Sequence, residues 1–134
     1  MPLKISKLGT HTAWVEDADT TNQLSVKICD TTNSNCCETP LNNGKQPFKY
    51  GKYDYFEESY LGNCLGFSLS KSHNYDVTIT TDGYNGWLGL TFDIIAINGA
   101  GKDEVLACPV NRWVDDKESI KLPCKWKGNC FNLI

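Results

Sequence analysis

The sequence predicts an all-β protein, an antiparallel β-sandwich of eight strands that is stabilised by disulfides. Three observations support this prediction. Short segments alternate apolar with polar residues, which is the period of a strand with one buried face. Turn-forming Gly, Asn and Asp separate these segments. No segment carries the apolar period of an amphipathic helix.

We expect the eight strands at residues 13–15, 24–29, 48–50, 65–69, 75–80, 88–97, 104–108 and 119–124. In the second segment, for example, Leu24, Val26 and Ile28 alternate with other residue types. The sixth segment keeps one apolar phase over residues 88–94, whereas Ile95 and Ile97 take the opposite phase. This change of phase predicts a bulge that turns the strand over.

The chain length and charge restrict the class of protein. We expect a single domain over residues 1–134, with a core at about 12–124 and a C-terminal tail at 125–134, since 134 residues leave no room for a second domain. The net charge is -3 and most lysines are scattered, which argues against nucleic acid as a partner. No apolar run approaches the length of a membrane helix, so we expect no membrane span.

Seven cysteines without a CxxC pair or a Cys/His ligand spacing predict disulfides rather than zinc, and therefore a secreted, extracellular protein. Side chains of adjacent residues point apart in extended backbone. Cys36 and Cys37 should therefore have different partners, although sequence does not fix the connectivity. We expect one of them to bond Cys29 and the other Cys64, and Cys108 to pair with Cys124. Cys130 is then left over, either as a free thiol or as a link in a homo-oligomer.

Five motifs occur in a characteristic order. They are an acidic turn between two strand segments (14–19 and 24–28), an aromatic segment with Gly51 and Asp54 (48–56), a leucine-glycine turn (61–62), an acidic loop that ends at a tryptophan (82–87) and a cysteine-to-tryptophan segment (108–113). Together they resemble the PLAT (LH2) domain, the β-sandwich of lipoxygenases, pancreatic lipases, polycystins and a bacterial toxin. With its many cysteines the chain is similar to versions found in secreted invertebrate proteins. The resemblance implies that Phe56 and Trp87 are buried.

The resemblance also places two acidic loops near each other, at one end of the sandwich. Hard cations prefer several oxygen ligands, so calcium is the cofactor that these loops suggest. The candidate ligands are Glu16, Asp17, Asp19, Asp82 and Asn85. The alternative is that they are ordinary turn residues, because Asp and Asn favour turns for backbone reasons.

Aromatic residues supply a second binding signal, because they stack on sugars and enter lipid interfaces. We expect Tyr84, Trp113 and Trp126 to contact the ligand. Tyr84 follows a turn glycine beside Asp82 and is expected to be exposed, whereas most other aromatic residues are expected to be packing residues. Trp126 lies within a lysine-bearing stretch, residues 121–127, that is a minor candidate for anionic headgroups or sugars.

We expect no catalytic residues. Neither His11 nor His73 has the sequence surroundings of a nucleophile elbow or a metal-binding helix. Glu57 and Glu58 are adjacent, so on a strand their carboxylates would point to opposite faces.

The sequence therefore supports two candidate functions. The first is a secreted, non-catalytic module that binds lipid, glycan or extracellular protein through its loops, assisted by calcium. The second is an extracellular structural or carrier protein that oligomerises and shelters an apolar small molecule. Stoichiometry separates them, because a carrier of this kind would be oligomeric and retain its ligand through purification.

Overall fold

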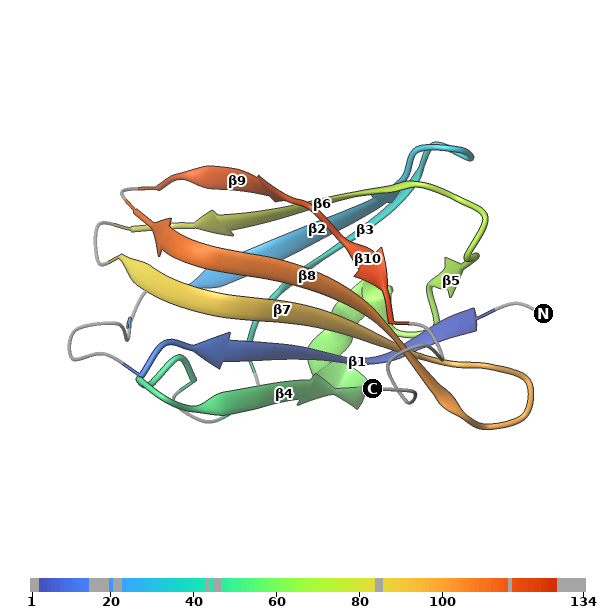
Figure 1. Ribbon diagram of the computed structural model, residues 1–134, viewed down its shortest axis with the longest axis horizontal. Coiled ribbons are helices and arrows are strands. Elements are labelled where there is room, and N and C mark those ends of the chain that lie inside the picture. The colour runs from blue at the N-terminus through green and yellow to red at the C-terminus, as the bar shows by residue number, and fades with distance from the viewer. Residues whose placement is uncertain are drawn as a thin grey trace.

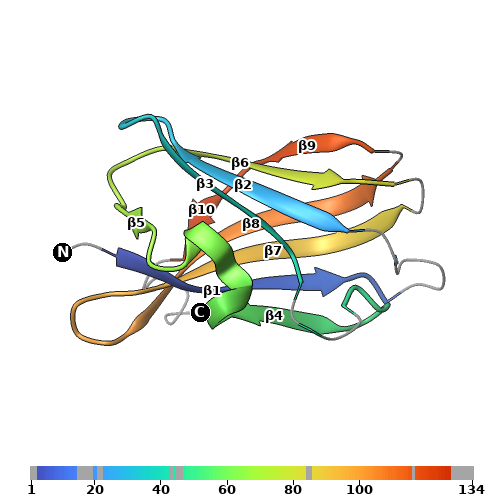
Figure 2. The ribbon, with the colours of Figure 1, turned by 180° about the vertical axis from the view of Figure 1, so that it is seen from behind.

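The computed structural model describes residues 3–14, 20, 23–42, 44, 47–83, 86–115 and 117–127. These residues form two antiparallel sheets that pack face to face (Figures 1 and 2). The predicted β-sandwich is confirmed, but the described residues contain ten strands rather than eight.

The larger sheet has six strands in the order β10-β8-β7-β1-β4, and β5 pairs with the start of β1. Its strands are β1 (Leu3–Thr12), β4 (Tyr53–Glu57), β5 (Ser68–Leu69), β7 (Trp87–Ile97), β8 (Asp103–Val114) and β10 (Lys125–Trp126). The smaller sheet has the order β3-β2-β6-β9. Its strands are β2 (Leu24–Asp30), β3 (Asn35–Pro40), β6 (Tyr75–Thr81) and β9 (Ser119–Leu122).

Three expectations about the elements were wrong. The first strand, expected at residues 13–15, is β1 at Leu3–Thr12, and Ala13 and Trp14 lie beyond its end. The sequence hides the apolar period of β1 because threonines take inward positions: Thr10 and Thr12 are fully buried. Residues 48–50 do not form a strand: Phe48 has a φ of 69°, and the Lys52 N–H donates to Lys49 O at 3.1 Å, which closes a turn over residues 49–52. Residues Glu58–Cys64 form a 3-10 helix, η1, although no helical period is present.

The core lies between the sheets and contains both aromatic residues that were expected there. Phe56 and Trp87 are fully buried, and the Trp87 indole N–H donates to Thr12 Oγ1 at 2.8 Å. At the start of β7 the residues that point into the core are in phase with Trp87, whereas further along the strand they are in phase with Phe92. The pairing of β7 with β8 shifts register between these two parts, at Gly89 and Thr91. A bulge is therefore present, but it precedes the position that the sequence indicated.

Three disulfides join Cys29 to Cys36, Cys37 to Cys64 and Cys108 to Cys124. Cys36 rather than Cys37 is thus the partner of Cys29. The bond Cys37–Cys64 ties β3 to the 3-10 helix, whereas Cys108–Cys124 ties β8 to the segment before β10. Cys130 lies outside the described residues.

Removing the bond Cys37–Cys64 is expected to destabilise the protein by about 3 kcal/mol, because a closed loop of this length restricts the unfolded chain. The two cysteines are 27 residues apart, and both are almost fully buried. The double variant Cys37→Ala/Cys64→Ala and the wild type are compared by urea unfolding. Equal free energies of unfolding would contradict this prediction.

Asp30, which is 4% exposed, organises the turn after β2. Its carboxylate accepts the backbone N–H groups of Thr32 and Asn33 at 2.9 and 3.2 Å, and lies 2.7 Å from His73 Nδ1. Burial raises the pKa of Asp30, but hydrogen bonds from His73 and from the two backbone groups outweigh burial and hold the pKa below its ordinary value. The charged carboxylate therefore stabilises the fold.

The variant Asp30→Asn is expected to lose about 1–2 kcal/mol at pH 7, because a charge-assisted bond to His73 is removed. A depressed carboxyl pKa stabilises the fold above the pKa of the unfolded chain, and this stabilisation is lost as pH falls through the folded pKa. The difference between the two proteins should therefore shrink below about pH 4. Urea unfolding from pH 7 to pH 3 measures it, and a constant difference would contradict the assignment.

Candidate functional site

One end of the larger sheet presents an exposed tryptophan. Trp14 directly follows β1 and is 74% exposed, the largest exposed fraction among the large hydrophobic residues that the structure describes. Its ring makes an edge contact with Tyr50, with 5.7 Å between centroids. In Figure 1 this end lies at the left, where β1 ends and β4 begins.

The turn that carries Tyr50 is joined to the end of β1 by backbone hydrogen bonds. The Gly51 N–H donates to the carbonyls of Thr12 and Ala13 at 3.2 and 3.0 Å, and the Thr12 N–H donates to Lys52 O at 3.0 Å. Gly51 has a φ of 71°, and a Cβ placed there would lie only 1.6 Å from the Trp14 ring. Glycine therefore allows the indole to pack directly on the turn. The Trp14 side chain is exposed, yet its ring packs at a defined place against Gly51 and Tyr50.

Two cationic side chains flank Tyr50, because Lys49 and Lys52 are both exposed in the same turn. We call the group Trp14, Lys49, Tyr50 and Lys52 the Trp14 tip. It combines large amphipathic rings with lysines, which is the composition of surfaces that lie in a membrane interface.

Trp113, one of the residues expected to bind ligand, is 39% exposed at the same end of the sheet. It pairs with Leu88 across β7 and β8, and the Ala13 N–H donates to Leu88 O at 3.0 Å. Two strand spacings, roughly 10 Å, thus separate Trp113 from the end of β1. Trp126 lies elsewhere, half-buried on β10 against Leu106.

Of the expected calcium ligands, the structure describes Asp82. Glu16, Asp17, Asp19 and Asn85, together with the aromatic candidate Tyr84, lie outside the described residues. Asp82 is described and exposed, and its Oδ1 accepts the Gln23 N–H at 2.9 Å, so it acts at least as a turn residue. Within the described part of the chain, no group of three or more His, Cys, Asp or Glu side chains is close enough to hold a metal ion.

One further carboxylate lies beside the second acidic loop. A Cβ at Gly86 would lie 2.0 Å from Asp115 Oδ1, so the Asp115 carboxylate rests against this glycine. The Lys117 N–H donates to Gly83 O at 2.8 Å, and this hydrogen bond joins the loop after β8, which carries Asp115, to the second acidic loop. These are hard oxygen donors of the type that calcium takes, but the described residues alone do not assemble a metal site.

Sequence reasoning missed Trp14, Lys49, Lys52 and Asp115. Tyr50 was noticed only as part of an aromatic segment. The available signal was the position of Trp14 two residues before an acidic run, since a tryptophan at the border of a polar loop has less core to enter than one within a strand.

No protein-family model matches the sequence, and no curated protein matches it. Solved structures do match. The alpha toxin of Clostridium absonum superposes with a TM-score of 0.68 at 21% identity, over 90% of this chain and 31% of the toxin. A coral 8R-lipoxygenase, whose structure is described as showing calcium activation via a C2-like domain, superposes with a TM-score of 0.65 at 19% identity, over 90% of this chain and 17% of the enzyme.

A third match is a LOX variant in complex with arachidonate, with a TM-score of 0.66 at 17% identity, over 93% of this chain and 17% of the enzyme. This chain thus spans a third or less of each of these proteins. The matches show the fold alone, a β-sandwich similar to the C2-like domain of the coral lipoxygenase. Among the described residues, no helix is long and apolar enough to cross a membrane.

Proposed function

We propose that this protein is a non-catalytic extracellular module that attaches to lipid membranes through the Trp14 tip. The observation that carries the proposal is the exposure of Trp14, which is 74% exposed although its ring is seated on Gly51 and Tyr50. Transfer of a large exposed ring from water into the interfacial region of a bilayer lowers the free energy.

The charges around the tip favour anionic lipid. Lys49 and Lys52 are exposed beside Tyr50, and each lysine near a negative membrane surface contributes about 1 kcal/mol. The net charge of the chain is -3, so attraction has to be local rather than a property of the whole molecule.

Calcium belongs to this proposal as an assisting ion. Glu16, Asp17, Asp19, Asp82 and Asn85 are the expected ligands, and Asp115 adds a carboxylate beside Gly86. Calcium would neutralise the charge of these acidic side chains and so reduce their repulsion from anionic lipid. The solved coral lipoxygenase supports the idea by its description of calcium activation via a C2-like domain.

An extracellular location is supported by the three disulfides, which persist in oxidising compartments.

Co-sedimentation with vesicles tests the proposal. Vesicles of phosphatidylcholine alone and of phosphatidylcholine with phosphatidylserine are each used with calcium and with a chelator. The protein is expected to bind both, more tightly to the anionic vesicles and more tightly with calcium. The double variant Lys49→Ala/Lys52→Ala should lose the preference for anionic vesicles. Protein that stays in the supernatant under all four conditions would contradict the proposal.

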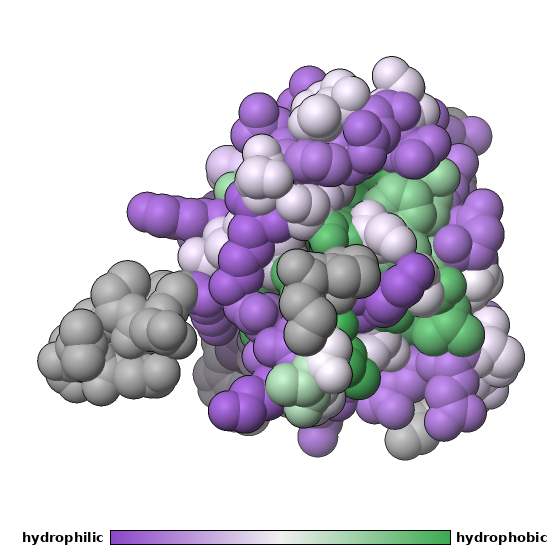
Figure 3. Space-filling model, turned by 90° about the vertical axis from the view of Figure 1, so that its right-hand side faces the viewer, coloured by the Kyte–Doolittle hydropathy of each residue, from purple (hydrophilic) through white to green (hydrophobic). Residues whose placement is uncertain are grey.

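A second candidate function, the carrier of an apolar small molecule, is favoured by a pocket of about 530 Å³ at the opposite end of the sandwich. Its apolar wall includes Ile5, Leu65 and Ile97, of which Leu65 is 51% exposed. Figure 3 shows this end of the molecule, where hydrophobic side chains gather between hydrophilic ones. Native mass spectrometry of protein from its natural source would show an additional nonprotein mass if this pocket carries a ligand.

A further inference from the structure

A second pocket at that end has a different character, because two lysines and a tryptophan are among the residues that line it. It has a volume of about 390 Å³, within the range of small-molecule sites. The side chains that matter are Lys71 and His73 from the loop before β6, and Lys125 and Trp126 from β10. None of its lining residues is a carboxylate. We call it the Trp126 pocket.

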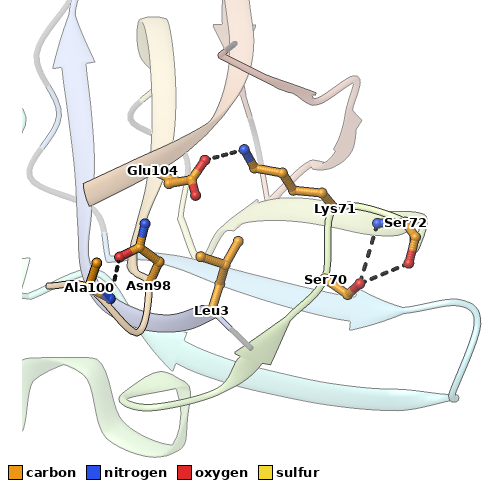
Figure 4. Close-up of a pocket in the computed structure, with 7 residues that line it drawn as sticks. All are labelled: Leu3, Ser70, Lys71, Ser72, Asn98, Ala100 and Glu104. Atoms are coloured by element: carbon orange, nitrogen blue, oxygen red, sulfur yellow. Dashed lines mark hydrogen bonds and ion pairs between the residues drawn. The ribbon is translucent and has the colours of Figure 1, made fainter. Parts of the chain in front are cut away.

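The loop that carries Lys71 and His73 is held in place by hydrogen bonds. The Tyr75 hydroxyl accepts the Ser70 N–H at 2.6 Å, and the His73 N–H donates to Ser70 O at 3.1 Å. The hydroxyls of Ser70 and Ser72 lie 2.9 Å apart. A dashed line joins them in Figure 4, which views a neighbouring pocket that shares Lys71 with the Trp126 pocket. These bonds fix the backbone of the loop that carries Lys71, and a preformed loop lowers the cost of binding.

The aromatic side is held by the larger sheet. Trp126 pairs with Leu106 of β8, and the next residue, Lys127, donates its N–H to Val105 O at 2.9 Å. The disulfide Cys108–Cys124 fixes the chain just before β10. One face of a tryptophan in such a position offers a flat apolar surface for the C–H groups of a sugar ring.

The charges leave capacity for an anion. Asp30, the partner of His73, is almost fully buried behind it. Lys125 is exposed and forms no ion pair with any described residue. Lys71 reaches between two partners: it pairs with Glu104 (Figure 4), and its Nζ lies 5.9 Å from the centroid of the Trp126 ring. A bound anion would therefore compete with Glu104 for Lys71.

We propose that the Trp126 pocket binds an anionic sugar, a monosaccharide unit that carries a sulfate or a carboxylate. The sugar ring packs on Trp126, while Lys71 and Lys125 donate to the anionic group. Asn74, which also lines the pocket, offers an amide for sugar hydroxyls. This site is independent of the Trp14 tip and lies at the other end of the sandwich.

Isothermal titration calorimetry with defined saccharides tests the proposal. The probes are a heparin-derived tetrasaccharide, a hyaluronan tetrasaccharide, a neutral maltotetraose and inorganic sulfate. We expect at least one anionic tetrasaccharide to bind, which also identifies the anion, and at least tenfold more tightly than maltotetraose or sulfate. Failure of both anionic probes, or equal binding of maltotetraose or sulfate, would overturn the proposal.

Matched variants locate the site. Lys71→Ala and Lys125→Ala should each weaken binding about tenfold, because each removes a charge-assisted hydrogen bond. Lys27→Ala, which removes an exposed lysine of β2, should change binding less than twofold. Trp126→Leu should also weaken binding, with the thermal midpoint measured as a check on folding. Equal effects of the Lys71 and Lys27 variants would overturn the assignment.

Glu104 provides the sharpest test. Glu104→Gln frees Lys71 and is expected to tighten binding several-fold, whereas Glu38→Gln, an equal charge change on β3, should not. A purely structural pair between Lys71 and Glu104 would give the same result for both variants. Trp14→Ala should leave saccharide binding unchanged, so this proposal and the membrane proposal fail separately.

Discussion

Replacing Trp14 with alanine is expected to weaken binding to phosphatidylcholine–phosphatidylserine vesicles about 30-fold. The expectation follows from the ring that enters the interface: roughly 80 Å² of inserted apolar surface contributes about 2 kcal/mol, and 1.4 kcal/mol corresponds to a factor of ten. Because Trp14 is 74% exposed, the substitution should change the free energy of unfolding by about 0.5 kcal/mol or less. Vesicle titration and urea unfolding of the same preparation measure both quantities.

Tyr60→Ala is the matched control, because Tyr60 is an exposed aromatic residue on the 3-10 helix and not in the Trp14 tip. It should bind vesicles as the wild type does. A Trp14→Ala protein that binds like the wild type, or one that loses binding only because it unfolds, would remove the Trp14 tip from the account.

Trp87→Ala is expected to have the opposite profile, a loss of about 4 kcal/mol of stability. Trp87 is fully buried, its ring centroid lies 5.8 Å from that of Phe48, and its indole N–H donates to Thr12 Oγ1. Alanine would leave a cavity and a buried hydroxyl without its donor. A loss of this size is a large part of the stability of a typical domain, so urea unfolding is measured at low temperature as well as at 25 °C.

Trp113→Ala is the control for this substitution, because Trp113 lies at the same end of the larger sheet but is 39% exposed. It should cost much less stability than Trp87→Ala. Equal losses in the two variants would contradict the placement of Trp87 in the core.

The sequence predicted the fold class because several strands have clean alternation. In β6, Val77 and Ile79 are fully buried between more exposed neighbours. Strand β1 could not be found this way, since its buried positions include Thr10 and Thr12 and its register shifts near Ser6. Buried polar residues and bulges both remove the period on which such predictions depend.

The candidate site was less predictable than the fold. An aromatic segment around Tyr50 is typical of a strand, yet it forms the turn on which Trp14 lies, through the positive φ angles of Phe48 and Gly51. Tryptophan is usually well buried, so nothing in the composition marked Trp14 as exposed. The contact of Trp14 with Gly51 joins residues far apart in the chain, which a local pattern cannot reveal.

Fluorescence quenching by brominated lipids tests the central claim most directly, because it reports whether the Trp14 ring enters the bilayer. Wild type and Trp14→Phe are compared on anionic vesicles that contain lipids brominated at different depths. The account predicts that lipids brominated near the headgroups quench the emission of the bound wild type, and that most of this quenching disappears in Trp14→Phe. Equal quenching of the two proteins, or no quenching of protein that is bound, would contradict it.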